Sequence, residues 1–482
     1  MKQPLRSGIS VGALKSFVWI GFAISLAGCN RSHPSGQDTA DHGVVQTWTT
    51  TADHSRLLDH QVADLRNSTE ASQSVIRIDT GTTMQVIQGF GFALTGGSAQ
   101  LIRKMDDQSR RELLTELFSS DELGISYLRI SIGASDLDAE VFSYNDLPSG
   151  NTDPEMAYFS LGRDTSDLIP LLHEILAMRP DLKIMASPWS APVWMKTNGQ
   201  SKGGSLKPEY YPAYAQYFVR YLTDMKLQGI NIDAITIQNE PEHGGNNPSM
   251  VMTATEQAAF IKHDLGPTLR AEGITTRIII WDHNCDHPEY PLEILGDPDA
   301  YPFVNGTAFH LYAGDVSAMG QVHDAYPDKA LYFTEQWTGA KGGFGGDFLW
   351  HIKNVLIGTL QNWSTVVLEW NLASDPNFEP HTPGGCTECK GALTIADNLV
   401  TRNVSYYIIG QAARFVPPGS VRIFSAGEES LSHVAFRRPD GELVLLGLNE
   451  NDQSISLAIE YGESSFSVAV PARAAITCIW KP

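Results

Sequence analysis

The feature that most constrains the fold is a repeated alternation of apolar, strand-like runs with amphipathic segments, which begins at about residue 87. Such an alternation is typical of a parallel sheet covered by helices. The segment from Tyr214 to Lys226, for example, has the spacing of an amphipathic helix. With a first strand at Gln88 to Phe92, the count reaches about the eight strands that close an α/β barrel. The other expected strands are Ile125 to Ile132, Lys183 to Ser187, Ala234 to Gln238, Thr275 to Trp281, Phe303 to Leu311, Ala330 to Thr334 and Thr365 to Trp370.

The two ends of the chain lack this alternation. From about residue 420 the sequence predicts consecutive strands separated by turn residues, which is typical of a β-sandwich. Two more strands are expected before the barrel, at Val45 to Thr50 and Val75 to Asp79, with a loop-like or weakly helical stretch between them. Because these two have no helical partner, we expect them to join the sandwich. The expected C-terminal strands are Leu431 to Arg437, Glu442 to Asn449, Ser454 to Ile459, Phe466 to Val470 and Ile476 to Trp480.

The fold class is therefore α/β: a (β/α)8 TIM barrel with a side β-sandwich built mainly from the C-terminus plus N-terminal strands. The expected domains are a lipoprotein signal peptide over residues 1–28, a flexible tether over 29–43, N-terminal strands over 44–86, the catalytic barrel over 87–412 and the C-terminal sandwich over 413–482.

The start of the chain resembles an export signal. Basic residues precede an apolar run from Phe17 to Leu26 that is too short to span a bilayer comfortably. The run ends in Leu26-Ala27-Gly28-Cys29, which resembles a bacterial lipobox with Cys29 as the lipidated residue. The alternative is an ordinary signal peptide cut near Ala27. We expect an exported protein, lipid-anchored at the cell envelope in the periplasm or outer membrane, with the anchor as its only membrane contact.

The overall charge narrows the class of partner. With a formal net charge of −21, the chain is a poor partner for nucleic acid and suits a soluble enzyme that acts on a neutral substrate. We expect a monomer that needs no cofactor.

The cysteines after residue 29 are disulfide candidates in an oxidising compartment, and they are Cys285, Cys386, Cys389 and Cys478. Cys386 and Cys389 are separated by two residues. A structural zinc ion would need two more ligands at comparable spacing, and the chain has no second such pair. A local disulfide and two free thiols both remain open.

Two glutamates follow predicted barrel strands, where barrel enzymes place their active sites. Glu240 lies in Asn239-Glu240-Pro241 after one strand, and Glu335 comes directly after another. Glycoside hydrolysis needs two carboxyl groups that flank the bond, and a separation of about 5 to 5.5 Å gives a retaining mechanism. We expect Glu240 to be the proton donor, with a pKa raised by the negative charge of Glu335.

Aromatic residues gather at the same strand ends. Rings with polar neighbours suit sugars, which present apolar C–H faces and a rim of hydroxyl groups. These residues are Trp189, Trp194, Trp281, His310, Tyr312, Trp337 and Trp370.

Two other classes of protein would fit parts of this sequence. A glycan-binding lipoprotein would have no reason to keep both carboxylates. A metal-dependent hydrolase could use His283, His287, His310 and His323, but their spacing fits no standard site. We therefore expect no metal.

Several short motifs at the predicted strand ends are familiar. They are Gln88-Gly-Phe-Gly91, Tyr127-Leu-Arg-Ile-Ser131, Ala186-Ser-Pro-Trp189, Trp194-Met-Lys-Thr-Asn198, Asn239-Glu-Pro241, Phe333-Thr-Glu335 and Trp370-Asn371. Together they resemble glycoside hydrolase family 30 from about residue 45 to the C-terminus. The resemblance implies that Glu240 is the acid/base and Glu335 the nucleophile. It also implies that a set of polar and aromatic residues lines the binding site for the sugar at the cleaved end. These residues are Arg129, Trp189, Asn239, His310, Tyr312 and Trp370.

One departure from the family bears on the substrate. Glucosylceramidases of the family carry an Asp where this chain has Thr95-Gly96-Gly97, and that Asp binds outer hydroxyls of a terminal glucose. Its loss predicts fewer charge-assisted hydrogen bonds and an open space where a chain linked through O6 could continue. This run and the segment His381 to Cys389 resemble the endo-β-1,6-glucanase branch, which predicts a pustulan-type β-1,6-glucan as substrate. The alternative is a glucosylceramidase, or an exo-acting β-glucosidase on short glucosides.

Overall fold

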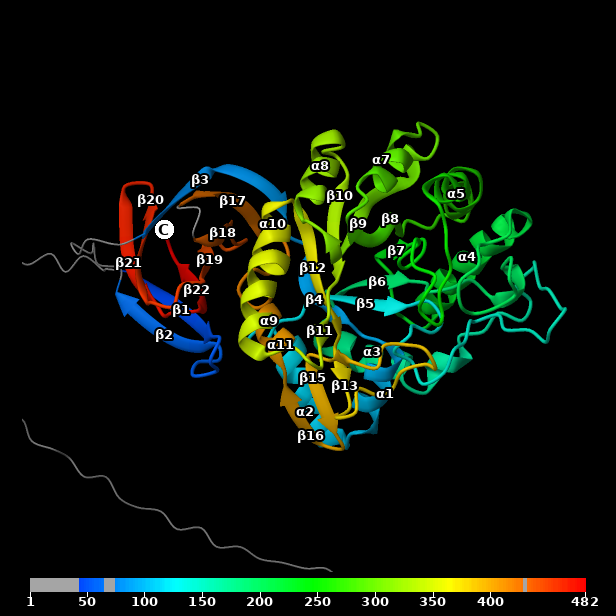
Figure 1. The fold of residues 1–482 in the computed structure, drawn as a ribbon, viewed down its shortest axis with the longest axis horizontal. Helices are drawn as coiled ribbons and strands as arrows, with labels where there is room; N and C mark the ends of the chain where they lie inside the picture. The colour runs from blue at the N-terminus through cyan, green and yellow to red at the C-terminus, as the bar shows by residue number, and fades with distance from the viewer. Residues whose placement is uncertain (1–42, 65–73, 428–430) are drawn as a thin grey trace, which may run out of the picture. The chain divides into compact units, whose positions relative to one another are not determined.

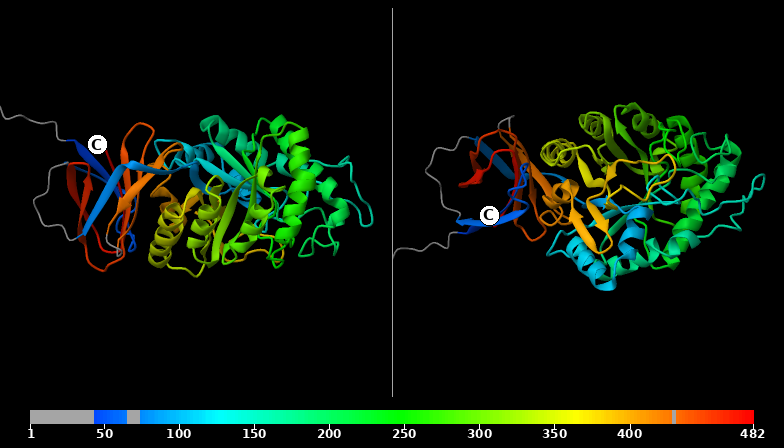
Figure 2. Two further views of the ribbon diagram at one scale, coloured as in Figure 1. Left: turned by 90° about the horizontal axis from the view of Figure 1, so that it is seen from above. Right: turned by 60° about the horizontal axis from the view of Figure 1, so that its bottom comes forward.

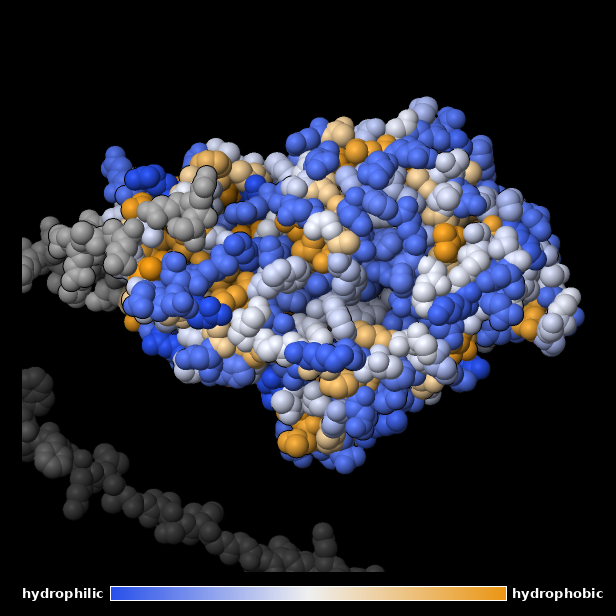
Figure 3. Space-filling model, in the orientation of Figure 1, coloured by the Kyte–Doolittle hydropathy of each residue, from blue (hydrophilic) through white to orange (hydrophobic). Residues whose placement is uncertain are grey.

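The computed structural model describes residues 43–64, 74–427 and 431–482. This part of the chain forms a closed eight-stranded barrel and a nine-stranded sheet (Figure 1). The expected signal peptide and the lipidation site Cys29 lie outside the described residues. Among the helices of the described ranges, none is both long and apolar enough to cross a bilayer. The face drawn in Figure 3 is mostly hydrophilic, with hydrophobic residues in small scattered groups.

The barrel contains the parallel strands that the sequence predicts, and its closure confirms the fold class. Around the barrel the strands follow the order β10-β12-β4-β5-β6-β7-β8-β9. Their bounds are β4 (Gly89–Ala93), β5 (Tyr127–Ser131), β6 (Lys183–Ser187), β7 (Ala234–Thr236), β8 (Arg277–Cys285), β9 (Val304–Gly314), β10 (Ala330–Glu335) and β12 (Ser364–Asn371).

Helices surround these strands (Figure 2). The predicted amphipathic helix is α4, which runs from Tyr211 to Leu227. The α5 and α9 segments continue through π-helical turns, η4 (Ile261–Leu265) and η6 (His351–Gly358), into α6 and α10. The other helices are α1 (Gly96–Lys104), α2 (Asp107–Phe118), α3 (Leu168–Met178), α5 (Ala254–Phe260), α6 (Gly266–Ala271), α7 (Glu289–Gly296), α8 (Ser317–Ala325), α9 (Phe344–Trp350), α10 (Thr359–Gln361) and α11 (Val404–Gly410).

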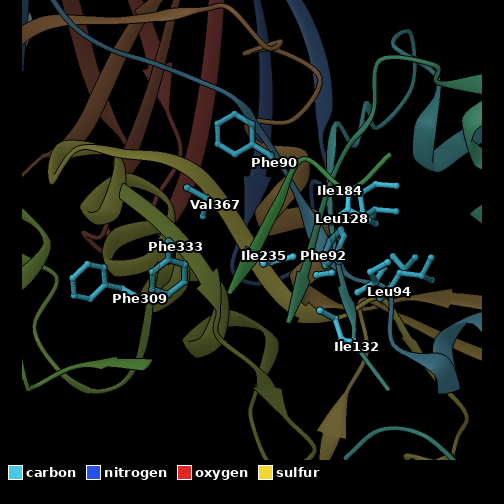
Figure 4. Packing of buried hydrophobic residues seen from close by; sticks show 14 of the residues in the cluster. Phe90, Phe92, Leu94, Leu128, Ile132, Ile184, Ile235, Phe309, Phe333 and Val367 are labelled. Atoms are coloured by element: carbon cyan, nitrogen blue, oxygen red, sulfur yellow. The ribbon is translucent and has the colours of Figure 1, made fainter. Parts of the chain in front are cut away.

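The two-residue period of the strands divides their buried side chains into two clusters. One set, which includes Leu128, Ile184, Ile235 and Phe333, belongs to the large core that the helices share (Figure 4). Alternate residues point into the barrel and form a separate apolar layer. Its members are Tyr127, Met185, Ala234, Ile279, Ala308, Tyr332, Val366 and Leu368.

The nine-stranded sheet joins the beginning and the end of the described chain. Its order is β2-β1-β22-β19-β18-β17-β3-β20-β21, and residues from distant strands share one core, so that the sheet forms a β-sandwich. The bounds are β1 (Val44–Thr51), β2 (Asp59–Asp64), β3 (Ser74–Val86), β17 (Val421–Ala426), β18 (Ser432–Arg437), β19 (Leu443–Asn449), β20 (Ile455–Tyr461), β21 (Ser464–Val470) and β22 (Ala474–Trp480).

The sequence predicted a loop-like or weakly helical stretch between the strands that are now β1 and β3. This prediction was wrong, because β2 forms there. Its sequence is polar, and it lies at the edge of the sheet, where it pairs with β1. The ring of His60 stacks on Trp48, with centroids 4.6 Å apart. An edge strand needs no apolar alternation, so the sequence pattern did not reveal it.

A buried glutamine joins the sandwich to the barrel. Gln411, just after α11, donates from Nε2 to Oγ1 of Thr50 at 2.8 Å. Its Oε1 accepts a hydrogen bond of 2.8 Å from Oγ1 of Thr477. The first and last strands of the sandwich are therefore fixed to the same point of the barrel.

Candidate active site

A polar layer lies next to the apolar layer inside the barrel. It occupies the positions two residues further along five strands, towards their carboxyl ends. These positions hold Arg129, Ser187, Thr236, His310 and Thr334, all of them buried. The same five strands contribute to both layers, so the change in chemistry comes from the side chains at these positions.

Arg129 is the centre of this layer and has no exposed surface. Its Nη1 donates to Oε2 of Glu335 at 2.6 Å, and its Nη2 donates to Oδ2 of Asp282 at 2.8 Å and to Oδ1 of Asn239 at 2.6 Å. The guanidinium also lies 4.8 Å from the ring centroid of Trp189. A buried guanidinium needs such partners, because an unpaired charge would be strongly destabilising.

Asp282 was not foreseen from the sequence. The β8 strand has a bulge at Trp281 and Asp282, where φ is 71° and 65°, and this turns the Asp282 carboxylate into the polar layer. There it accepts hydrogen bonds from Thr334 at 2.7 Å and from Nε2 of His310 at 3.2 Å. Although burial opposes its charge, Arg129 and these hydrogen bonds hold the pKa of Asp282 far below its usual value.

The two glutamates meet at His310. One oxygen of Glu240, one of Glu335 and a ring nitrogen of His310 all lie within 4.8 Å of one another. Nδ1 of His310 is 3.2 Å from Oε1 of Glu240. The hydroxyl of Tyr312 donates to Oε1 of Glu335 at 2.9 Å. Both carboxylates are buried.

The protonation of this group differs from the expectation for Glu240. Burial opposes the charge of His310, yet Glu335, Asp282 and Glu240 raise its pKa to about 9. Burial also opposes the charge of Glu240, but the hydrogen bond and charge of His310 hold the pKa of Glu240 below its usual value. Burial and, to a lesser extent, the charge of Glu240 raise the pKa of Glu335. In the free protein His310 therefore carries the proton that Glu240 was expected to carry. The prediction that the pKa of Glu240 is raised was wrong.

Both glutamates open into a cavity of about 310 Å³. The rings of Trp189 and Trp370 form one wall, with centroids 5.5 Å apart. Tyr312 and Trp337 also line the cavity. The remaining lining residues are Asp136, His243, Asn246, His283, Asn284, Cys386 and Cys389.

Two of the aromatic candidates are structural. Nε1 of Trp194 donates to Oδ1 of Asn145 at 3.0 Å, and its ring packs against Tyr210. Trp281 is buried against Tyr290, with ring centroids 4.4 Å apart. Neither tryptophan lines the cavity.

Asp136 is a second carboxylate that the sequence did not indicate. It follows β5 in a loop, and its Oδ2 accepts the Cys386 N–H at 3.2 Å. Burial, followed by the charge of Glu335, raises its pKa to about 7. Cys386 is joined to Cys389 in a disulfide. Cys389 lies in β14 (Cys389–Lys390), which pairs with β11 (Thr338–Gly339), and β11 follows Glu335 closely in the chain. The disulfide segment thus closes one side of the cavity.

The loop after β5 packs closely against Gly96 and Gly97. A Cβ at Gly96 would lie 1.7 Å from Oδ1 of Asp138, and one at Gly97 would lie 2.5 Å from the carbonyl oxygen of Leu137. The loop after β5 therefore fills the volume that a side chain would occupy. Asp136 from this loop also lines the cavity, so a carboxylate is present there although the run Thr95-Gly96-Gly97 contains none.

The remaining cysteine and histidine candidates do not form further sites. Cys285 and Cys478 are buried free thiols and do not pair. His287 binds Glu242, and His323 stacks on Trp363 with ring centroids 3.8 Å apart.

In the part of the chain that the structure describes, the one cluster with the spacing of metal ligands is Glu240, His310 and Glu335. The positive charge of Arg129, 2.6 Å from Glu335, disfavours a cation there.

An eight-stranded parallel barrel whose carboxyl-terminal mouth holds two adjacent buried glutamates between aromatic walls defines a glycoside hydrolase. Residues 87–416 match the family model described as the glycosyl hydrolase family 30 TIM-barrel domain, and residues 419–478 match the β-sandwich domain of the same family. The chain belongs to glycosyl hydrolase family 30.

The chain is similar to relatives with two different activities. The chain is 33% identical to an endo-1,6-β-D-glucanase of Aspergillus fumigatus, over 79% of this chain and 82% of the relative. It is 27% identical to the lysosomal acid glucosylceramidase of Mus musculus, over 97% of this chain and 95% of the relative. The solved structure of the endo-β1,6-glucanase BT3312 superposes with a TM-score of 0.85 at 33% identity, covering 91% of this chain and 99% of that one.

Proposed function

We propose that this chain is an exported, retaining β-glycoside hydrolase that cleaves β-1,6-glucan, with Glu335 as nucleophile and Glu240 as acid/base. The observation that carries the mechanism is the separation of the two carboxylates, which have oxygens within 4.8 Å of each other. Retaining enzymes keep their carboxyl groups about 5 to 5.5 Å apart, whereas inverting enzymes keep them about 6.5 to 9.5 Å apart to admit a water.

Glu335 is held ready for attack. Arg129 binds its Oε2 and Tyr312 binds its Oε1, so that the carboxylate has a fixed orientation at the floor of the cavity. In the first step a Glu335 oxygen forms a bond to the anomeric carbon while the bond from that carbon to the leaving oxygen breaks. In the second step a water oxygen attacks the same carbon and releases Glu335.

The hydrogen-bonded pair of Glu240 and His310 supplies the proton. The proton on Nδ1 of His310 passes to Oε1 of Glu240 across their 3.2 Å contact, and Glu240 passes it to the leaving oxygen. Glu240 is then a carboxylate again, and in the second step it takes the proton of the attacking water and can return it to His310. Asp282 keeps the imidazole oriented by accepting from Nε2.

The aromatic wall and the polar layer suit a bound glucose unit. Trp189 and Trp370 offer faces for the C–H groups of the sugar, and Asp136 offers hydrogen bonds to its hydroxyl groups. These three residues line the same cavity as Glu335, so this part of the cavity holds the sugar on the cleaved side of the bond. Asn239 acts behind them, because its Oδ1 accepts from Arg129.

The preference for a β-1,6-glucan is supported by the relatives. The endo-1,6-glucanases are more similar in sequence than the mouse glucosylceramidase, at 33% against 27% identity. The glucosylceramidase matches over a larger share of the chain, so glucosylceramide and short β-glucosides are the second candidate substrates.

Export and a lipid anchor on Cys29 complete the proposal, and mass spectrometry of the mature N-terminus tests them.

Product analysis on pustulan, laminarin and glucosylceramide tests the substrate. Gentiobiose and longer β-1,6-oligosaccharides from pustulan are expected. Glucose from glucosylceramide or short glucosides alone would instead support the second candidate. Glu335→Gln is expected to abolish turnover on every substrate while oligosaccharide binding persists, because the amide keeps the shape of the side chain but cannot attack.

A further inference from the structure

The part of the cavity wall beyond Glu240 has no role in the mechanism above. Its lining consists of His243, Asn246, His283 and Asn284. His243 follows Glu240 by one turn, and its N–H donates to the Glu240 carbonyl at 2.8 Å. His283 and Asn284 come from the end of the neighbouring strand, β8.

The bulge in β8 explains how His283 reaches the cavity. A regular strand would point consecutive side chains to opposite faces. Because Trp281 and Asp282 both have positive φ, the strand turns so that Asp282 enters the polar layer and His283, the next residue, also lines the cavity. Left-handed backbone at two non-glycine residues in succession is strained, and such strain is concentrated at functional sites.

His283 is buried but has an unused hydrogen-bonding group. Its side chain packs against Trp281 and is 7% exposed. Among the described residues, none forms a hydrogen bond with its Nδ1. Burial lowers its pKa to about 4, so the ring is neutral at ordinary pH and presents one donor and one acceptor. Nδ1 is itself fully buried, so the imidazole meets the cavity with its remaining edge.

Asn284 continues this polar wall. Its Oδ1 accepts the Tyr312 N–H at 2.9 Å, which fixes the side chain. Within the described ranges no acceptor binds its Nδ2, so the amide can donate to a ligand.

The acid/base must reach the oxygen that leaves, so the groups beside Glu240 face the leaving group. We propose that His283 and Asn284 form a binding subsite for a leaving group that is itself a sugar, and that they select an oligosaccharide over a lipid-linked glucoside. This inference rests on the proposed function, and it adds that the leaving group is a sugar. Sugar hydroxyl groups can both donate and accept hydrogen bonds, as a neutral imidazole and an amide at the cavity wall require, whereas an alkyl chain can do neither.

Two substrates separate this role from a structural one. A β-1,6-linked glucotetraose has a sugar leaving group, and 4-nitrophenyl β-glucoside has an aryl leaving group without hydroxyl groups for the subsite. For His283→Ala and Asn284→Ala, kcat/KM on the tetraose should fall about tenfold further than on the aryl glucoside, mainly through KM. His283→Asn, which keeps a donor and an acceptor, should recover part of the loss.

The control is His173→Ala, which removes an exposed histidine on α3 that does not line the cavity. Its rates on both substrates should stay at wild-type values. Equal losses on the two substrates in both His283→Ala and Asn284→Ala, or no loss in either, would overturn the subsite. If instead the wild-type enzyme fails to cleave the tetraose but hydrolyses glucosylceramide, the proposed function fails, and that outcome is visible before any variant is compared.

Discussion

The same strands contribute to the apolar and the polar layer inside the barrel, yet the two layers have different roles. Tyr127 and Met185 in the first layer pack against other apolar side chains, whereas Arg129 and Ser187, two residues further on, take part in a hydrogen-bonded group of buried charges. The apolar layer stabilises the barrel through burial. The polar layer carries a desolvation cost that only mutual pairing offsets, and in return it gives fixed charges in a site with little water.

The comparison predicts how each layer responds to substitution. Removing a methyl group from the apolar layer leaves a small cavity. Removing one member of the polar layer leaves another charge or polar atom without its partner. The polar layer should therefore be the more sensitive of the two, both in stability and in activity.

The largest effect is expected for Glu240→Gln. On a natural glucan, kcat should fall by about 10² to 10⁴, because the leaving oxygen no longer receives a proton. On an aryl glucoside with an acidic leaving group, the first step should be nearly normal, and added azide should accelerate release of the glycosyl-enzyme. Steady-state kinetics with and without azide check this. A uniform loss on both substrates with no azide effect would assign Glu240 another role.

The next largest effect is expected for Arg129→Met. It leaves the carboxylates of Asp282 and Glu335 without their cation, and the free energy of unfolding should fall by about 3 to 5 kcal/mol. Urea denaturation measures this loss. A fall no larger than that of a conservative change in the apolar layer would contradict the difference between the layers.

The pH dependence of stability sharpens the comparison further. The pKa of His310 is raised from 6.5 to about 9, so its charge stabilises the fold fully below pH 6.5, and this contribution is lost as the pH rises towards 9. Relative to His310→Gln, the wild-type protein should lose up to about 3 kcal/mol across that range. Urea denaturation at several pH values measures it. Parallel curves for the two proteins would show that His310 does not carry this charge.

The smallest effect is expected in the apolar layer. Ile279→Val removes one methylene group and should cost about 0.5 to 1.5 kcal/mol of stability. Its kcat and KM should match those of the wild type, because Ile279 does not line the cavity. An altered pH profile in this variant would mean that the layers are coupled more closely than their separate contacts indicate.

The sequence predicted those parts of the site that depend on regular strands. Glu240 and Glu335 follow apolar runs, and the barrel brings the ends of those runs together. Asp282 could not be predicted, because a bulge with two positive φ values turns it inward and no residue pattern marks the bulge. Asp136 was missed because its loop is fixed by Cys386, 250 residues further along the chain. The close contact of Asp138 with Gly96 also joins distant segments of the chain, so the sequence did not reveal it.

The most direct test of the mechanism is mass spectrometry of the protein after incubation with a 2-deoxy-2-fluoro-β-glucoside that carries a good leaving group. The slow second step should trap a glycosyl-enzyme, and peptide mapping should place the added sugar on Glu335, with no label in Glu335→Gln. Label on a different residue, or turnover of β-glucosides that yields the α-anomer first without any trapped intermediate, would contradict a double displacement at Glu335.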